Sequence, residues 1–369
     1  MRVAAILGTR PEAIKLAPVV SALRKTPGVK CAVVSTGQHR EMLNQMLDLF
    51  ELRTDVDLAV MRPGQQLPDL TADLIRGLGG TIAALEPDWS IVQGDTTTAF
   101  CGALASFYAG IPVAHVEAGL RSGCERTPFP EEANRQLVAR LATLHFSPTV
   151  RSAENLLAEG VARDRVLVTG NTVIDTLIWA VGRARRLPPS FRSSRRHRIL
   201  LTVHRRENHG SALLRVCHAV RLLARRGDVE VVFPVHRSPS VQSVVKRELS
   251  GVAGVRLSDP LDYLALVSAL DACDLVVTDS GGLQEEGPAL GKPVLVLRDA
   301  TERPEAVEVG VARLVGTDSA AIVKAVTLLL DDPLAYAAMA RMESPFGDGR
   351  ASLRIVDALE EWHALRAAA

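Results

Sequence analysis

The sequence predicts an α/β fold with two parallel-sheet domains, and three observations support this prediction. Short apolar runs alternate with amphipathic stretches along the whole chain, a pattern typical of parallel sheets covered by helices on both faces. The length of 369 residues is about twice the usual domain size of roughly 150 residues. The alternation also restarts after Gly170-Asn171. We therefore expect two Rossmann-like domains, with a ligand cleft between them.

The first domain is expected to span residues 1–170. Apolar runs predict its buried strands at residues 3–7, 31–35, 90–92, 113–116 and 165–168. Amphipathic stretches predict its helices at residues 11–24, 42–47, 71–85, 96–108, 131–141 and 152–160. Pro11 suits the first turn of a helix, where the missing N–H would have no partner in any case.

The second domain is expected to span residues 171–350. Its strands are predicted at residues 199–203, 230–233, 275–278 and 293–297. Its helices are predicted at residues 172–184, 212–225, 241–249, 263–270 and 320–330. The basic stretch 185–198 contains Pro188-Pro189 and is interpreted as a solvated loop, with a guanidinium patch for an anion as the alternative. An amphipathic helix at 353–365, within a C-terminal segment of about 351–369, is expected to pack back on the first domain.

The composition excludes several classes of protein. Lys and Arg total 43 against 42 Asp and Glu, so nothing indicates a nucleic-acid or membrane partner. The five cysteines are scattered without zinc-site spacing and are interpreted mostly as small core residues, so no metal is expected. No apolar run reaches the roughly 20 residues that span a bilayer, and residues 1–7 are too short for a signal peptide. A cytoplasmic location is expected.

Two glycine turns after predicted strands suit phosphate groups. Gly8 precedes a helix that carries Arg10 and Lys15, and backbone amides at a helix start favour anions. Gly281 and Gly282 follow another strand and let the backbone approach a ligand closely. A tight turn without a ligand is the alternative at both places. Neither turn matches a dinucleotide fingerprint or a P-loop.

Polar side chains beside these turns suggest a nucleotide and acid/base chemistry. Ser280 can donate to a phosphate, and Glu286 can accept from ribose hydroxyls. Asp95, Glu117 and Glu131 follow three apolar segments; gathered in a cleft, carboxylates suit proton transfer. For each of them a helix N-cap is the alternative, above all for Asp95 before Thr96-Thr97-Thr98.

A histidine motif follows the first strand of the second domain. His204 is grouped with Arg205, Arg206, Glu207 and Asn208. A lone histidine is more often structural, but this grouping at a strand end favours a functional role. A second histidine, His236, follows the next strand at an equivalent position.

These segments together resemble the non-hydrolysing UDP-N-acetylglucosamine (UDP-GlcNAc) 2-epimerases, which have the GT-B architecture. The resemblance runs in order through nearly the whole chain. It rests on Gly-Thr-Arg-Pro-Glu at residue 8, Thr-Gly-Gln-His-Arg-Glu at 36, Gln-Gly-Asp-Thr-Thr-Thr at 93, His-Val-Glu-Ala-Gly-Leu-Arg at 115, Pro-Phe-Pro-Glu-Glu-Ala-Asn-Arg at 128, Gly-Asn-Thr-Val-Ile-Asp at 170, His-Arg-Arg-Glu-Asn at 204, Pro-Val-His at 234, Thr-Asp-Ser-Gly-Gly-Leu-Gln-Glu-Glu at 278 and Thr-Glu-Arg-Pro-Glu at 301.

The resemblance implies specific roles for residues of both domains. The acid/base carboxylates would be Asp95, Glu117 and Glu131, with His204 facing them. The contacts to the nucleotide sugar would come from Arg10, Lys15, Ser280, Gly281, Gly282, Glu286 and Arg303, with uracil held near Leu261 to Leu266. Some members hold a second, regulatory UDP-GlcNAc, which here would meet Gln38, Arg205, Glu207 and His236. The chain departs from that pattern at Glu41 and at Pro63-Gly64-Gln65, and the segment Cys124-Glu125-Arg126 departs near the sugar.

The resemblance also implies a reaction. The proton at C2 of an N-acetylhexosamine is not acidic, so the family eliminates UDP to form 2-acetamidoglucal and then adds UDP back, converting UDP-GlcNAc into UDP-ManNAc without a cofactor. A homodimer is expected. The alternatives are a hydrolysing epimerase, an epimerase of a modified UDP-hexosamine or hexuronate, a GT-B glycosyltransferase, and a non-catalytic sugar-nucleotide sensor.

Overall fold

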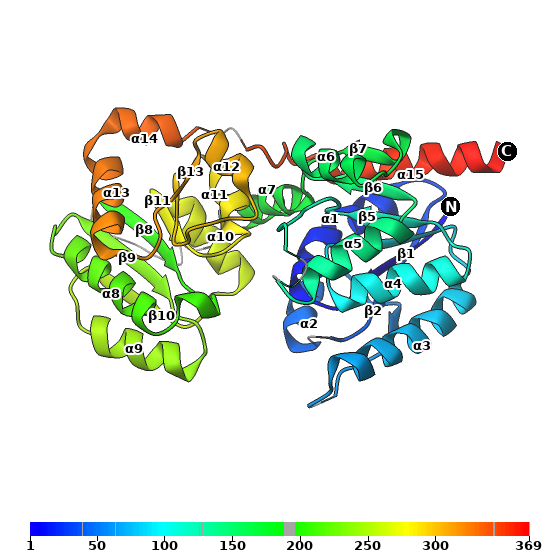
Figure 1. Ribbon diagram of the computed structural model, residues 1–369, viewed down its shortest axis with the longest axis horizontal. Helices are drawn as coiled ribbons and strands as arrows, with labels where there is room; N and C mark the ends of the chain where they lie inside the picture. Colours follow the sequence, from blue (N-terminus) through cyan, green and yellow to red (C-terminus); the bar gives the residue numbers. More distant parts are fainter. Residues whose placement is uncertain are drawn as a thin grey trace. The chain divides into compact units, whose positions relative to one another are not determined.

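The computed structural model describes residues 1–38, 40–62, 64–124, 126, 128–187, 196–341 and 344–368. The chain divides into two compact units, one formed by Met1–Thr176 with Phe346–Ala369 and the other by Leu177–Pro345. Each unit contains one sheet whose strands are all parallel. The predicted α/β class is therefore confirmed (Figure 1).

The first unit has a seven-stranded sheet in the order β3-β2-β1-β4-β5-β6-β7. Its strands are β1 (Arg2–Leu7), β2 (Lys30–Ser35), β3 (Val56–Asp57), β4 (Trp89–Gln93), β5 (Val113–Val116), β6 (Leu144–Ser147) and β7 (Val166–Val168). Its helices are α1 (Arg10–Lys25), α2 (Arg40–Leu49), α3 (Leu67–Leu85), α4 (Thr97–Tyr108), α5 (Glu131–Leu141), α6 (Val150–Ala158), α7 (Thr172–Ala184), which continues into the second unit, and α15 (Ala351–Ala368), with a 3₁₀ turn η1 (Arg163–Arg165).

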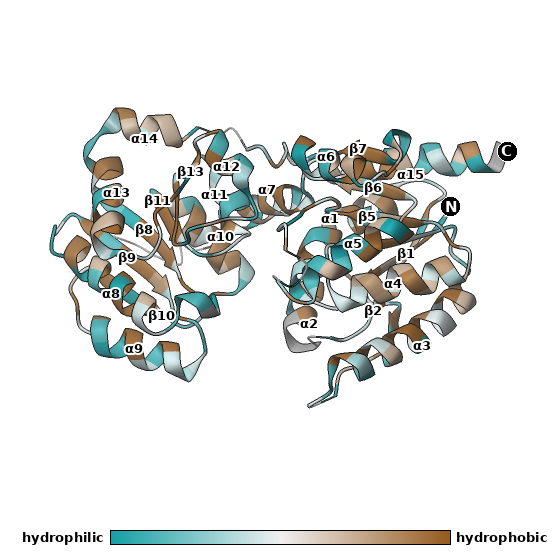
Figure 2. Ribbon diagram, viewed as in Figure 1, coloured by the Kyte–Doolittle hydropathy of each residue, from teal (hydrophilic) through white to brown (hydrophobic). Residues whose placement is uncertain are grey.

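The layers of the first unit follow from which helices touch. Helix α4 packs between α3 and α5, whereas α1 contacts α2 and the C-terminal helix α15. The central strands β1, β4 and β5 are almost wholly buried between these helices. In Figure 2 the labelled strands β1 and β5 are coloured mainly as hydrophobic, and the helices around them are mixed. Burial on both faces explains why the strands read as continuous apolar runs rather than alternating ones.

The second unit has a six-stranded sheet in the order β10-β9-β8-β11-β12-β13. Its strands are β8 (His197–Thr202), β9 (Val229–Pro234), β10 (Val255–Ser258), β11 (Leu275–Thr278), β12 (Val294–Val296) and β13 (Ala312–Leu314). Its helices are α8 (Ser211–Ala224), α9 (Pro239–Leu249), α10 (Tyr263–Ala272), α11 (Leu283–Ala289), α12 (Pro304–Glu308), α13 (Ser319–Asp331) and α14 (Pro333–Met339), with a 3₁₀ turn η2 (Arg206–Asn208). No helix in the described part of the chain is long and apolar enough to cross a membrane.

The start of α15 is tied to α7 by a buried carboxylate. Asp175 accepts hydrogen bonds from the backbone N–H groups of Ala351 (3.1 Å) and Ser352 (2.8 Å) and from the Ser352 hydroxyl (2.5 Å). This carboxylate therefore satisfies helix-start amides 176 and 177 residues further along the chain. It joins the C-terminal segment to the first unit.

We expect Asp175→Ala to lower the free energy of unfolding by about 1–3 kcal/mol, because buried amides lose their acceptor. The matched control is Asp348→Ala, which breaks the exposed ion pair with Arg354 (2.7 Å) beside the same helix. An exposed pair of this kind contributes about 0–1 kcal/mol. Urea denaturation of both variants checks the prediction, and equal losses would contradict it.

Candidate active site

Several polar residues predicted from the sequence follow the carboxyl ends of strands, close to the point in each sheet where the strand order reverses. In the first unit this point lies between β1 and β4, and in the second between β8 and β11. Loops after adjacent strands diverge there, which leaves room for a ligand. Each unit therefore presents one candidate site.

A fully buried carboxylate shapes the turn after β1. Glu12 has 0% exposure and accepts from the backbone N–H groups of Gly8 (2.9 Å) and Thr9 (2.7 Å) and from the hydroxyls of Thr9 (2.8 Å) and Thr96 (2.5 Å). Burial raises the pKa of Glu12, and these hydrogen bonds oppose the rise. The Thr96 bond links the turn after β1 to the turn after β4. Arg10 and Lys15 are thus carried on a helix whose start is rigidly held.

Glu117, directly after β5, sits at the centre of a polar cluster. Its backbone is left-handed (φ 63°), which is uncommon for a residue with a side chain. The Lys15 ammonium contacts both carboxylate oxygens at 2.5 Å, Asn171 donates at 3.1 Å, and the Gln93 amide donates as well. Lys15, expected at the diphosphate, is therefore the ion-pair partner of a candidate acid/base carboxylate. These contacts fix the position of Glu117.

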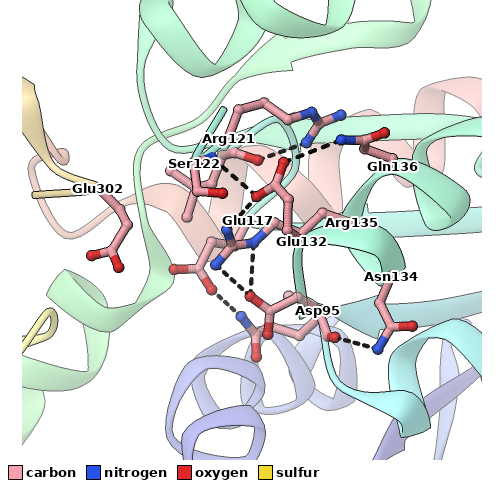
Figure 3. Close-up of polar contacts among 12 residues, drawn as sticks. Asp95, Glu117, Arg121, Ser122, Glu132, Asn134, Arg135, Gln136 and Glu302 are labelled. Carbon is pink, nitrogen blue, oxygen red and sulfur yellow. Dashed lines mark hydrogen bonds and ion pairs between the residues drawn. The ribbon is translucent and has the colours of Figure 1, made fainter. Parts of the chain in front are cut away.

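Asp95, after β4, is held by helix α5. Its carboxylate forms an ion pair with Arg135 at 2.7 Å, and Glu132 contacts the same guanidinium at 2.9 Å (Figure 3). The cap of α4 is Thr96, whose hydroxyl accepts from the Ala99 N–H, so the alternative that made Asp95 the helix cap is wrong. The carboxylate of Asp95 is therefore available for another role.

Glu131 differs from its neighbour Glu132. Within the described residues the Glu131 side chain makes no hydrogen bond or ion pair, and it is partly exposed. Glu132 is fully buried, and it also accepts from the Ser122 N–H at 3.0 Å. The sequence predicts a role for Glu131 but carries no separate signal for the neighbouring Glu132.

Two histidines lie buried beneath this edge of the sheet. His115 and His145 are paired in register on β5 and β6, and His115 donates from Nε2 to the Gly94 carbonyl at 2.8 Å. Burial lowers the pKa of His115 to about 4 and that of His145 to about 3. Both rings are therefore neutral in the folded protein near neutral pH.

This burial predicts acid sensitivity. In the unfolded chain the histidine binds a proton near its ordinary pKa of about 6.5. In the folded protein the pKa of His115 is about 4, so the ring binds a proton only at much lower pH. The contribution of His115 to the free energy of unfolding is fully present above about pH 6.5 and is lost as the pH falls towards 4. We expect the free energy of unfolding to drop by about 2 kcal/mol between pH 8 and pH 5 through His115. Urea denaturation at both pH values should show a smaller drop for His115→Asn, and an unchanged drop would refute this origin.

The second unit presents a glycine turn after β11, at residues 280–282. Directly before it, Asp279 is fully buried and accepts from the backbone N–H groups of His204 (3.1 Å) and Arg205 (3.0 Å) and from the Asn208 amide (3.0 Å). This carboxylate fastens the loop after β8 to the loop after β11. Asp279 is a candidate functional residue for which the sequence analysis predicts no role, because its partners become visible only in the folded chain.

The His204 ring projects from this junction. Its Nε2 lies 3.6 Å from the Asp279 carboxylate, and its side chain is about half exposed. Partial burial lowers the pKa of His204, Asp279 opposes that shift, and the nearby Arg205, His236 and Arg298 reinforce it. The ring is therefore biased towards its neutral form and is accessible to a ligand.

An arginine lies against the glycine turn. A Cβ atom at Gly281 would be 3.0 Å from Nη1 of Arg303, so the guanidinium faces the glycine backbone. Nε of Arg303 contacts the buried Glu285 at 2.8 Å, and Glu302 lies 3.6 Å from Nη1. Burial of Glu302 raises its pKa, but Arg298, Arg205 and Arg303 outweigh it and bring the pKa to about 2. This region therefore carries a dense, fixed set of guanidinium groups.

The other expected nucleotide contacts are also placed in the second unit. Glu286 is buried in α11, where it accepts from the Tyr263 hydroxyl at 3.4 Å and lies beside Gly282. Leu261 and Leu266 are partly buried before and within α10. Glu286 therefore lies next to the glycine turn.

The residues expected at a regulatory site fall in both units. Gln38 in the first unit accepts from the Thr98 hydroxyl at 3.0 Å. In the second unit Glu207 pairs with Arg298 at 3.0 Å, Arg205 pairs with Glu302 at 3.4 Å, and His236 accepts from the Ser238 N–H at 3.1 Å. Pro63, Glu125 and the side chain of Glu41 lie outside what the structure describes, as does most of the basic stretch 185–198.

Comparison with known proteins identifies the family. The family model described as UDP-N-acetylglucosamine 2-epimerase matches residues 21–360. The UDP-N-acetylglucosamine 2-epimerase of Escherichia coli K12 is 49% identical over 372 residues, covering 98% of each chain. The crystal structure of the Neisseria meningitidis UDP-GlcNAc 2-epimerase bound to UDP-GlcNAc matches with a TM-score of 0.90 at 43% identity, covering 98% of this chain and 100% of that one.

A more distant relative has the same fold. The Methanocaldococcus jannaschii UDP-GlcNAc 2-epimerase in complex with UDP-GlcNAc and UDP matches with a TM-score of 0.83 at 32% identity, covering 98% of this chain and 100% of that one. The likeness to these structures confirms the expected GT-B-like architecture of two parallel-sheet domains. The chain belongs to the UDP-N-acetylglucosamine 2-epimerase family and is an enzyme of the epimerase kind.

Proposed function

We propose that the protein interconverts UDP-GlcNAc and UDP-ManNAc without net hydrolysis. UDP leaves C1 as a base removes the C2 proton, giving 2-acetamidoglucal; a proton then returns to the opposite face of C2, and UDP adds back to C1. The atoms balance, because the proton and the UDP that leave are both restored. The reaction is redox-neutral and therefore requires no net transfer of electrons to a cofactor.

The observation that carries the proposal is the pair of carboxylates after the neighbouring strands β4 and β5. Asp95 and Glu117 are each held by a cation, Arg135 and Lys15 respectively, at 2.7 Å and 2.5 Å. Fixed carboxylates of this kind suit proton removal and return at a carbon atom. We assign proton transfer to Asp95, Glu117 and Glu131.

The leaving diphosphate needs positive charge and hydrogen-bond donors. We assign this role to Arg10, Arg303, the accessible His204 ring and the glycine turn at residues 280–282, with Lys15 shared between Glu117 and the ligand. Such preorganised charge stabilises the departing group more than it stabilises the bound substrate. Glu286 is assigned to the ribose.

Product identification tests the proposal. UDP-GlcNAc incubated with the protein should yield UDP-ManNAc at a fixed equilibrium ratio. The concentration of free UDP should stay at or below the enzyme concentration. Anion-exchange chromatography measures the sugar nucleotides and UDP. Stoichiometric free UDP with N-acetylmannosamine would instead show a hydrolysing epimerase. Turnover that begins only with an added acceptor sugar would show a glycosyltransferase.

A further inference from the structure

Two side chains of helix α5 hold Asp95, one through its backbone carbonyl and the other through its carboxylate. Nε and Nη2 of Arg135 contact the same carboxylate oxygen, Oδ2, at 2.8 and 2.7 Å, while the Asn134 amide donates to the Asp95 carbonyl at 2.9 Å. Among the described residues, Oδ1 of Asp95 accepts no hydrogen bond. One oxygen of this carboxylate is therefore fully engaged, and the other is left open (Figure 3).

A second carboxylate anchors the far edge of the guanidinium. Glu132 accepts from Nη1 of Arg135 at 2.9 Å, from the Ser122 N–H at 3.0 Å and from the Gln136 amide at 3.3 Å. Burial raises the pKa of Glu132, but these donors together bring it below its ordinary value. Glu132 is thus a charged, immobile anchor that prevents Arg135 from changing its orientation.

We propose that Arg135 and Glu132 are positioning residues that hold the Asp95 carboxylate in one orientation, with Oδ1 open to the proton at C2 of the hexose. The proposal rests on the function proposed above. Arg135 spans the two carboxylates because its planar guanidinium offers donors on two edges, a geometry that lysine does not have. Neither residue needs to touch the substrate.

The role predicts a specific split in the kinetic constants. In Arg135→Met, kcat for epimerisation should fall by about 100-fold, since a misaligned catalytic group costs roughly that much. The KM for UDP-GlcNAc should change little, because the diphosphate contacts lie elsewhere. The kcat of Arg135→Lys should be about ten-fold higher than that of Arg135→Met, because lysine restores the charge but does not contact both carboxylates.

A matched variant separates positioning from general destabilisation. Arg121 is as buried as Arg135 (11% and 10% side-chain exposure) and forms a comparable ion pair, with Glu159 at 2.6 Å, that does not touch Asp95. Arg121→Met should lower the melting temperature without the selective loss of kcat. If Arg135→Met is too unstable to purify, Glu132→Gln keeps a hydrogen-bond acceptor but loses the charge. That variant should lower kcat by about ten-fold with UDP affinity retained.

The outcomes discriminate between the hypotheses. A wild-type protein that does not epimerise UDP-GlcNAc would refute the proposed function itself. An active wild type with an Arg135→Met variant of normal kcat would refute only the positioning role. Parallel losses of kcat in Arg135→Met and Arg121→Met, or a lysine variant no better than the methionine variant, would show that Arg135 serves stability alone.

Discussion

The Asp95→Asn variant is expected to epimerise UDP-GlcNAc about a thousand-fold more slowly than the wild type, because general acid/base groups contribute a factor of roughly 10²–10⁴ to the rate. Asparagine preserves the shape of the side chain but cannot accept the C2 proton. The Arg135 contact at 2.7 Å will weaken as well, yet the glycine turn in the second unit is untouched. UDP affinity measured by calorimetry should therefore stay within a few-fold of the wild-type value.

Glu117→Gln provides the companion test. It removes the charge that Lys15 contacts at 2.5 Å and should also suppress exchange of the C2 proton with solvent. If either variant exchanged this proton at the wild-type rate, the assignment of that carboxylate to proton transfer would be wrong. A loss of UDP affinity equal to the loss of rate would point to a binding role instead.

The second large effect is expected at Arg303. Its guanidinium faces the glycine turn, where we place the diphosphate. Charge-assisted hydrogen bonds are worth about 1.5–3 kcal/mol, so Arg303→Met should weaken UDP binding by about 10- to 100-fold. Isothermal titration with UDP measures the change directly.

Two further variants make the Arg303 result interpretable. Removing the guanidinium leaves Glu285, with 2% side-chain exposure, without this cation. The double variant Glu285→Gln/Arg303→Met also removes the buried carboxylate charge that Arg303 contacts, so it should regain stability but not UDP affinity. Arg215→Met changes an exposed arginine that bonds Thr317 and should bind UDP normally. Wild-type affinity in both Arg303 variants would exclude this arginine from the diphosphate site.

The regular part of the fold was predictable from the sequence. Strands β5 and β11 and helices α5 and α7 have the predicted bounds, and β11 and α7 have strongly apolar patterns. The prediction missed β3, β6, β10 and β13, which have two to four residues each. Strand β6 also carries His145 and Ser147, and their polarity concealed a fully buried segment. Short strands gain their stability from neighbours, which a local pattern does not show.

The candidate site was predictable only in part. Most candidate residues directly after strands were predictable, because parallel strands deliver their carboxyl ends to one edge, but Asp279, directly after β11, was not. The interaction partners of these site residues were not predictable, because their contacts form only in the folded chain. These partners are Gln93, Asn171, Arg135 and Glu285. The interpretation of the cysteines holds for Cys101, Cys217 and Cys273, whereas Cys124 is exposed and is not a core residue.

Deuterium incorporation at C2 tests the central claim most directly. UDP-GlcNAc is incubated with the protein in heavy water, and both sugar nucleotides are examined by NMR and mass spectrometry. The elimination and re-addition of UDP predicts one deuterium at C2 of UDP-ManNAc and, at equilibrium, of UDP-GlcNAc. UDP-ManNAc formed with its C2 hydrogen fully retained would contradict proton exchange at C2 and with it the role given to the carboxylates.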